Sequence, residues 1–398
     1  MKRRVPALSL LLVVLATSAS AAPAGHGFDG RPLRSQAVEQ IARETLAKAQ
    51  IPALGLAIVD DGKVTFLGAY GQRDVAKALP LQTDTVMYAA SLTKAAFAYL
   101  VAELADEGAI DLDAPISRYL KKPLPEYAFY KALAGDERWR KLTPRLLMGH
   151  SSGFANFAFF EPDKTLKFHF TPGERYAYSG EGIQLMQFVL EEGLGLDVEA
   201  EMQRRMYGPF QMPRTSMKWR EDFAGNLTTG YLPDGSAEAH HKRARVRAAG
   251  NMDTTIGDYA NFLAALTRGD GLSPAGRAQI WRRAVPIRTP HQFPTLGEPE
   301  AGTYAKIRLA SALGWVTFDG PFGQVIVKGG HDDYVDNLAL CTARRCILMM
   351  TNSGVGERMF PMLVKRIMGD PGMPWAWEYN PLLPLEPSSP APSKPSGD

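Results

Sequence analysis

Ser91 and Lys94 are the residues whose types and spacing best suit chemistry. They form the only Ser-x-x-Lys of the sequence, at the start of an apolar run that continues to Ala105. Residues three positions apart share one face of a helix, so the Ser91 hydroxyl and the Lys94 amine would point into the same space. A serine in the first helical turn also leaves its backbone N–H able to receive an oxyanion. This pattern predicts acyl transfer; the alternative is a helix-start serine beside a solvated lysine.

Tyr178 and Lys328 could complete such a site. Tyr178 lies in a Tyr-Ser-Gly segment just ahead of a predicted helix, and a phenol beside a cation such as Lys94 can relay a proton. Lys328 ends an apolar strand, and Gly329 and Gly330 after it would let a substrate approach the backbone. The alternatives are that Tyr178 is a core aromatic residue and that Lys328 is a charge on an edge strand.

Ser151 is a rival nucleophile. The segment 149–153 matches the Gly-x-Ser-x-Gly elbow, which follows a buried strand and precedes a helix. Here the preceding residues begin with Thr143 and Pro144, a helix cap followed by a proline suited to the first helical position. Because a helix is expected where an elbow needs a strand, this second site is disfavoured.

The adjacent histidines His240 and His241 raise the question of a metal site. Neither has partners at metal-ligand spacing, and no His-Glu-x-x-His occurs in the sequence. We therefore expect a solvated loop at these two residues, and neither a metal nor a cofactor.

The first 21 residues have the pattern of a secretory signal peptide. Basic residues at 2–4 precede an apolar core at 8–15 and small residues at 19–21. The apolar core is shorter than the roughly 20 residues of a membrane span, so we expect a periplasmic or secreted protein without a stable membrane anchor. Removal of the three basic residues takes the formal charge from +3 to near neutral, which gives no reason to expect a nucleic-acid partner.

The rest of the chain is long enough for one large domain. We predict a linker at 22–35, a domain at 36–370 and a Pro/Ser-rich tail at 371–398. Hydrophobic spacing predicts helices at 35–50, 91–105, 182–192, 256–266 and 359–368 and one starting at 143, with strands at 54–59, 64–67, 313–318, 324–328, 338–341 and 346–350. Strands at both chain ends bracket a helical middle, so we expect an antiparallel sheet built from both ends and an inserted helical lobe.

Cys341 and Cys346 are the only cysteines of the sequence. Two apolar runs separated by a four-residue turn predict a hairpin that places them opposite each other, at a separation that a disulfide can span. Export would favour oxidation. Two packed free thiols are the alternative.

Three motifs together resemble those of the class C β-lactamase and penicillin-binding-protein superfamily, which also includes esterases and D-amino-acid peptidases. They are Ser91-x-x-Lys94, Tyr178-Ser-Gly180 and Lys328-Gly-Gly330, in the order and rough spacing of that superfamily. The resemblance implies an α+β, β-lactamase/DD-peptidase-like fold, in which an antiparallel sheet from both chain ends is flanked by helices. The site would lie between this sheet and the inserted lobe.

The resemblance also implies roles for individual residues. The catalytic residues would be Ser91, Lys94, Tyr178 and Lys328, with Ser91 as the nucleophile. The backbone N–H groups of Ser91 and His331 would form the oxyanion hole. The substrate-binding positions would be Gly180, Gly329 and Gly330. The expected partner is a small-molecule or peptide substrate.

Two departures from the superfamily bear on the substrate. Gly180 stands where relatives usually carry Asn, and Gly329 replaces the hydroxyl residue that often follows the Lys. Gly180 removes an amide that would hold a substrate carbonyl, so we expect turnover of small esters or D-configured peptide amides rather than β-lactams. Gly329 weakens the recognition of a substrate carboxylate. The alternatives are a true β-lactamase or DD-peptidase, and a non-catalytic binding protein for cell-wall fragments or β-lactams.

Overall fold

The computed structural model describes residues 23–297, 299 and 302–386. The predicted signal peptide at 1–21 lies outside these residues, as does the end of the predicted tail. Within the described ranges, no helix is both long enough and apolar enough to cross a membrane.

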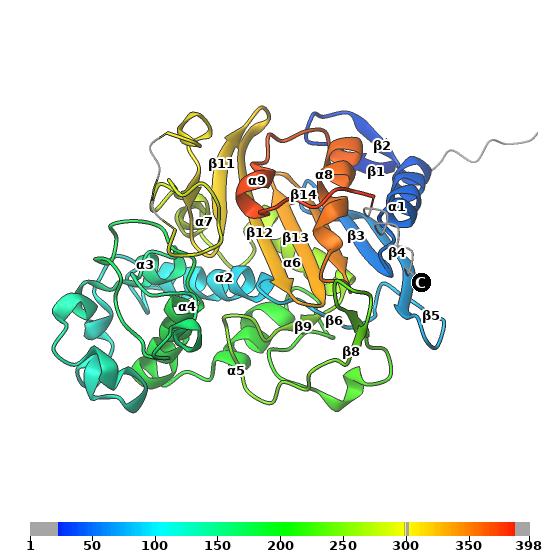
Figure 1. The fold of residues 1–398 in the computed structure, drawn as a ribbon. Coiled ribbons are helices and arrows are strands. Elements are labelled where there is room, and N and C mark those ends of the chain that lie inside the picture. Colours follow the sequence, from blue (N-terminus) through cyan, green and yellow to red (C-terminus); the bar gives the residue numbers. More distant parts are fainter. Residues whose placement is uncertain (1–22, 298, 300–301, 387–398) are drawn as a thin grey trace, which may run out of the picture.

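An eight-stranded antiparallel sheet forms the centre of the molecule (Figure 1). Its order is β10-β11-β12-β13-β14-β3-β4-β5, so strands from the two ends of the chain meet where β14 pairs with β3. Its strands are Ala53–Asp60 (β3), Lys63–Asp74 (β4), Leu79–Pro80 (β5), Ala310–Ser311 (β10), Val316–Gly320 (β11), Gly323–Asp332 (β12), Val335–Cys341 (β13) and Arg345–Thr351 (β14). The prediction of a sheet assembled from both chain ends is confirmed.

Three small sheets and the helices complete the fold. The paired short strands are Pro23–His26 (β1) with Pro32–Arg34 (β2), Met87–Tyr88 (β6) with Asp253–Thr254 (β9), and Gly230–Tyr231 (β7) with Ala237–Glu238 (β8). The α-helices are Ser35–Ala49 (α1), Leu92–Asp106 (α2), Pro144–Met148 (α3), Gly180–Phe188 (α4), Val198–Met202 (α5), Ile256–Arg268 (α6), Pro274–Trp281 (α7), Phe360–Leu363 (α8) and Trp375–Glu378 (α9). The 3-10 helices and π-helical turns are Ile116–Arg118 (η1), Leu124–Glu126 (η2), Ala128–Leu133 (η3), Glu137–Lys141 (η4), Ala158–Phe160 (η5), Val189–Gly193 (η6), Gln203–Tyr207 (η7), Glu221–Phe223 (η8), Ala305–Ile307 (η9), Gly356–Met359 (η10) and Val364–Met368 (η11).

Both faces of the large sheet are buried, which explains why residues 53–59 of β3 are apolar rather than alternating. Successive side chains of a strand point to opposite faces. Leu56 and Ile58 therefore pack in a core with α1 and α8, whereas Ala57 and Val59 pack in a second core with α2 and α6. The mainly helical lobe, with α3, α4 and α5, extends from the α2 side of the sheet (Figure 1, cyan to green). In this arrangement the N-terminus of α2 lies next to β12, where Gly330 is close to Ala89 and Leu92.

Two predicted boundaries are corrected by the structure. The linker predicted at 22–35 contains β1 and β2 and buries Phe28 and Leu33. The residues 371–386, which were assigned to the tail, contain α9 and bury Trp377 and Tyr379. Large aromatic side chains bury enough apolar surface to fix a short segment that lacks strong periodicity.

The structure joins Cys341 and Cys346 by a disulfide across the β13–β14 hairpin. Because the closed loop is short, we expect the bond to contribute only about 2 kcal/mol to the free energy of unfolding. Titration of the denatured, unreduced protein should detect no free thiol, and the Cys341→Ser/Cys346→Ser double variant should lose stability by that amount in urea unfolding. Two titratable thiols would contradict the bond.

Candidate active site

Ser91 lies at the N-terminus of α2. Ala90 has a left-handed φ of 46°, and this turn leads the chain into the helix. The N–H groups of Leu92 and Thr93 donate to the carbonyls of Ala89 and Ala90, whereas no hydrogen bond between described residues uses the N–H of Ser91. The position therefore offers both a hydroxyl and a free backbone donor.

Lys94 lies one turn further along α2 and is 1% exposed. Its Nζ donates to Ser91 Oγ at 2.8 Å and also to the carbonyl of Ala249. Burial lowers the pKa of Lys94, and the charge of Lys328 lowers it further against the opposing effect of Tyr178. An amine that gives up its proton this readily can accept the hydroxyl proton of Ser91.

Tyr178 is held between the two amines. Lys328 Nζ donates to the Tyr178 hydroxyl at 3.3 Å and to the carbonyl of Gly329 at 2.9 Å. The Nζ atoms of Lys94 and Lys328 each lie 5.0 Å from the centroid of the Tyr178 ring. The ring of His150 stacks on the Tyr178 ring with 4.3 Å between the ring centroids, and this contact helps to fix the plane of the Tyr178 ring.

The edge of β12 brings His331 to the start of α2. Asp332 pairs with Val335 across a two-residue turn, so the backbone of Asp332 hydrogen-bonds to β13. Because only alternate residues of β12 form these bonds, the N–H of His331 points away from β13. It points to the opposite edge of β12, beyond the end of β11. A Cβ at Gly330 would lie 2.6 Å from the carbonyl oxygen of Ala89. Only glycine permits this approach of β12 to the start of α2.

Two predicted substrate-binding glycines adjoin side chains from other segments. A Cβ at Gly180 would lie 2.4 Å from Phe157, while the Gly180 N–H donates to Asn156 Oδ1 at 2.9 Å. A Cβ at Gly329 would lie 2.3 Å from Glu378 Oε1. The space next to each glycine is therefore filled by an aromatic ring in one case and a carboxylate in the other.

His331, whose side chain is 26% exposed, lies between two buried carboxylates. Its Nδ1 lies 2.8 Å from Asp336 Oδ1 and its Nε2 lies 3.3 Å from Glu378 Oε1. Burial favours the neutral ring, but the hydrogen bonds to both carboxylates outweigh it and raise the pKa of His331 to about 9. Glu378 also accepts from Gln292 Nε2 at 3.0 Å. The positive charge of His331 is therefore already compensated within the protein.

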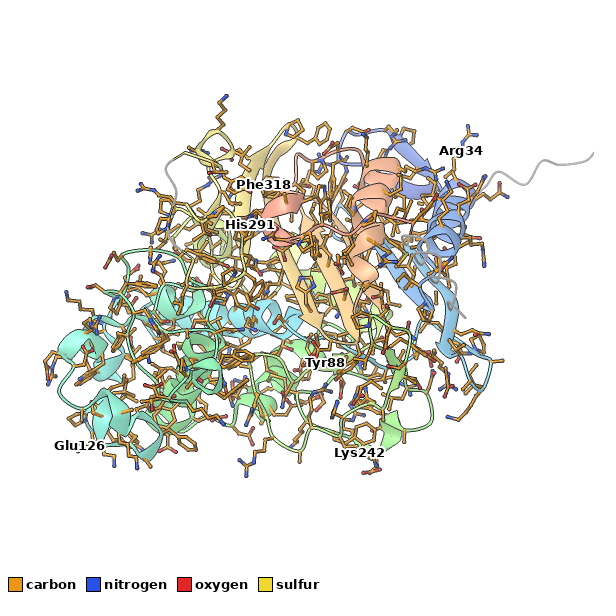
Figure 2. All side chains as sticks on the ribbon, in the orientation of Figure 1. Arg34, Tyr88, Glu126, Lys242, His291 and Phe318 are labelled. Carbon is orange, nitrogen blue, oxygen red and sulfur yellow. A yellow bond between two sulfur atoms is a disulfide. The ribbon has the colours of Figure 1, made fainter. Side chains whose placement is uncertain are left out.

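Ser91, Lys94, Tyr178 and Lys328 line one cleft of about 320 Å³ between the β12 edge and the helical lobe. The aromatic side chains that line the same cleft are Tyr88, Phe157, Phe159, Phe160 and Phe293. Figure 2 labels His291 beside α9, where His291 Nδ1 lies 2.9 Å from the carbonyl oxygen of Ala376. The C-terminal segment is thus tied to the loop that carries Phe293.

Ser151 and the adjacent histidines lie elsewhere. Ser151 follows α3 rather than a strand, is fully buried and donates its hydroxyl to the carbonyl of Arg175 at 3.0 Å. The prediction of a solvated loop is wrong for His240, whose side chain is 4% exposed with Nε2 3.1 Å from Asp253 Oδ1. The buried carboxylate of Asp253 therefore lies next to this imidazole. No group of three His, Cys, Asp or Glu side chains in the described part of the chain could hold a metal ion.

Sequence reasoning missed His150, Asp336 and Glu378. His150 lies within the segment 149–153, where no pattern in the sequence marks it for this role, and Asp336 lies next to β12 only through the hairpin. Glu378 comes from a segment that no motif marks. Glu378 is brought to His331 because the neighbouring Trp377 is buried. The carbonyl of Trp377 also accepts a hydrogen bond from the N–H of Gln292 at 2.8 Å.

A buried Ser-x-x-Lys helix start that faces a tyrosine and the lysine-bearing edge of an antiparallel sheet defines the class of serine β-lactamase-type proteins. The family model described as Beta-lactamase matches residues 38–366, and the chain belongs to this family. The match covers the sheet, the lobe and the four cleft residues, but ends before Glu378.

Individual relatives are distant. The chain is 21% identical to Protein flp of Staphylococcus aureus (strain MRSA252) over 350 residues, which cover 83% of this chain and 65% of that protein. It is 30% identical over 142 residues to the serine beta-lactamase-like protein LACTB, mitochondrial, of Mus musculus, covering 34% of this chain and 23% of that protein. The chain thus spans about two thirds of the length of Protein flp.

Two solved structures share the fold. The octameric penicillin-binding protein homologue from Pyrococcus abyssi has a TM-score of 0.65 and 17% identity, covering 82% of this chain and 75% of that one. D-alanine carboxypeptidase AmpC from Burkholderia cenocepacia has a TM-score of 0.66 and 18% identity, covering 84% of this chain and 98% of that one. The predicted β-lactamase/DD-peptidase-like α+β fold is therefore confirmed.

Proposed function

We propose that this protein is a serine hydrolase that cleaves an ester or amide through an acyl-enzyme on Ser91. The observation that carries the proposal is the 2.8 Å contact between Ser91 Oγ and the buried Nζ of Lys94. Burial lowers the pKa of Lys94 and so supplies a proton acceptor beside the nucleophile.

In the proposed mechanism, Ser91 Oγ attacks the substrate carbonyl carbon as its proton passes to Lys94. The N–H groups of Ser91 and His331 receive the oxyanion. The bond to the leaving group then breaks, and Lys94 and Tyr178 return the proton to that group. Water attacks the acyl-enzyme, releases the acid and restores the Ser91 hydroxyl. Lys328 holds the Tyr178 hydroxyl in place through its hydrogen bond.

A serine-directed fluorophosphonate probe, followed by mass mapping, tests the proposal. Labelling of Ser91 supports the hydrolase, labelling of Ser151 would instead support the elbow, and absence of any label favours the non-catalytic binding protein. Turnover of a short-chain aryl ester and of a chromogenic cephalosporin should be compared on the same preparation. Efficient cephalosporin turnover without esterase activity would favour the true β-lactamase.

We also propose that the protein is exported to the periplasm or secreted. The signal-peptide pattern of residues 1–21 and the disulfide between Cys341 and Cys346 support this location. The N-terminal sequence of protein purified from its native host should begin near residue 22. A native protein that retains residues 1–21 would contradict export by cleavage.

The ionisation of Lys328 predicts an alkaline limit on activity. Burial lowers its pKa to about 8, against the charge of Glu378, which raises it. Because the cation loses its charge as the pH rises through this value, kcat/KM for a neutral ester should fall above about pH 8. The Glu378→Gln variant removes the supporting charge, so its falling limb should lie at lower pH.

The matched control for this pH profile is Glu126→Gln, an exposed residue at the outer end of the lobe that is labelled in Figure 2. Its limb should coincide with that of the wild type. If kcat/KM of Glu378→Gln falls at the same pH as that of the wild type, Lys328 does not determine the alkaline limit.

A further inference from the structure

Phenylalanine side chains gather at the mouth of the serine cleft. Phe159, Phe160 and Phe293 are 58%, 67% and 41% exposed, and all three line the cleft together with Ser91. Exposed Phe rings are costly in water, and a contiguous group of them at a concave site marks a place for an apolar ligand. We call Phe157, Phe159, Phe160 and Phe293 the aromatic rim.

The aromatic rim is ordered as two walls. On the η5 side, Phe157 stacks on Phe159 with ring centroids 5.1 Å apart, and Phe159 lies 4.4 Å from Phe160. On the other side, Phe293 lies 5.5 Å from the ring of Tyr178. Because Tyr178 also contacts Lys328, the rim begins directly at the proposed reacting groups.

The rim leads out of the cleft into an adjoining cavity of about 740 Å³. Phe160 and Phe293 line both spaces. The adjoining cavity is also lined by the exposed carboxylates of Asp332 and Asp333, whereas the carboxylates of Asp336 and Glu378 in the same cavity are paired with His331. A chain that follows the aromatic rings away from Ser91 therefore meets negative charge, which favours an uncharged group over an anionic one.

We infer that the aromatic rim binds the acyl group of the substrate and that this group is an uncharged alkyl or aryl chain. The inference rests on the proposed function and names its substrate class: esters with an apolar acyl chain, rather than short polar acyl groups or acyl groups that end in a carboxylate. The rings supply apolar contact along the chain, and the carboxylates of the adjoining cavity oppose a terminal anion.

A series of p-nitrophenyl esters tests the inference. With acetate, butyrate, hexanoate and octanoate, kcat/KM should rise with chain length, by up to about fourfold per methylene that the rim covers. The mono-p-nitrophenyl ester of adipic acid, which has the hexanoyl length but ends in a carboxylate, should be turned over at least tenfold less efficiently than the hexanoate.

The Phe159→Ala/Phe160→Ala variant removes the exposed part of one wall. The ratio of its kcat/KM on octanoate to that on acetate should fall about tenfold or more, and Ser91 should still be labelled by a fluorophosphonate. Phe129→Ala is the matched control, because Phe129 is 84% exposed but lies in η3, at the outer end of the lobe near the labelled Glu126 (Figure 2). This control should behave as the wild type.

Three outcomes would overturn the inference. The first is a wild-type kcat/KM that does not rise with chain length. The second is an equal loss of kcat/KM on acetate and octanoate in the double variant. The third is a kcat/KM on the adipate monoester that equals that on hexanoate. In each of these cases labelling of Ser91 by the probe would leave the proposed function standing. Absence of labelling would remove the proposed function and the inference with it.

Discussion

Replacement of Ser91 by alanine is expected to reduce ester hydrolysis by roughly 10⁴-fold or more, because it removes the atom that forms the acyl-enzyme. The residue is partly accessible at the end of α2, so the fold should be retained. Steady-state hydrolysis of a p-nitrophenyl ester, with thermal unfolding as a check on folding, measures the effect.

Ser151→Ala serves as the comparison for this variant. Ser151 is fully buried and its hydroxyl bonds to a carbonyl, so the change is expected to alter stability more than turnover. Full activity in Ser91→Ala, or loss confined to Ser151→Ala, would show that the nucleophile has been misassigned.

Replacement of Lys94 by methionine is expected to reduce the rate of acylation by about 10³-fold, within the range found for loss of a general base. Methionine keeps most of the side-chain length and needs no partner in a site where Lys94 is 1% exposed. The amine is lost, and with it the group 2.8 Å from Ser91 Oγ that takes up the proton.

The measurement is the rate of fluorophosphonate labelling of Ser91, which reports nucleophilic attack by Ser91 without a deacylation step. Lys122→Met, at an exposed lysine of the lobe, is the control and should label at the wild-type rate. Wild-type labelling in Lys94→Met would transfer the role of base to Tyr178, whose ring centroid lies 5.0 Å from Lys94 Nζ. Slow labelling in Lys94→Met with a normal unfolding temperature supports Lys94.

The large sheet could be predicted because its strands are marked by local patterns. The sequence shows strand character in the apolar run of β3 and in the two halves of the cysteine hairpin, without reference to the rest of the chain. Asp61 and Gly62 likewise mark the turn between β3 and β4. Segments whose structure depends on distant partners were missed. Strands β1 and β2 are short, and α9 is one turn long, so burial of Phe28 and Trp377 rather than periodicity determines their form.

The residues of the site also fall into those that the sequence marks locally and those that it does not. Ser91, Lys94, Tyr178 and Lys328 could be named because each lies in a short segment whose chemistry is visible locally, and the structure brings all four to one cleft. The groups that surround them have no such mark. Glu378 reaches Gly329 only because α9 folds back across the sheet, and the aromatic rim forms only when η5 meets the loop of Phe293.

The most direct test of the central claim is to trap the acyl-enzyme with an ester substrate. Rapid quenching in acid during turnover of p-nitrophenyl butyrate, followed by intact-mass and peptide mass spectrometry, should show one added butyryl group on the peptide that contains Ser91. The Lys94→Met variant should accumulate it more slowly. Hydrolysis that proceeds without any covalent acyl group, or with the acyl group on another residue, would contradict the account.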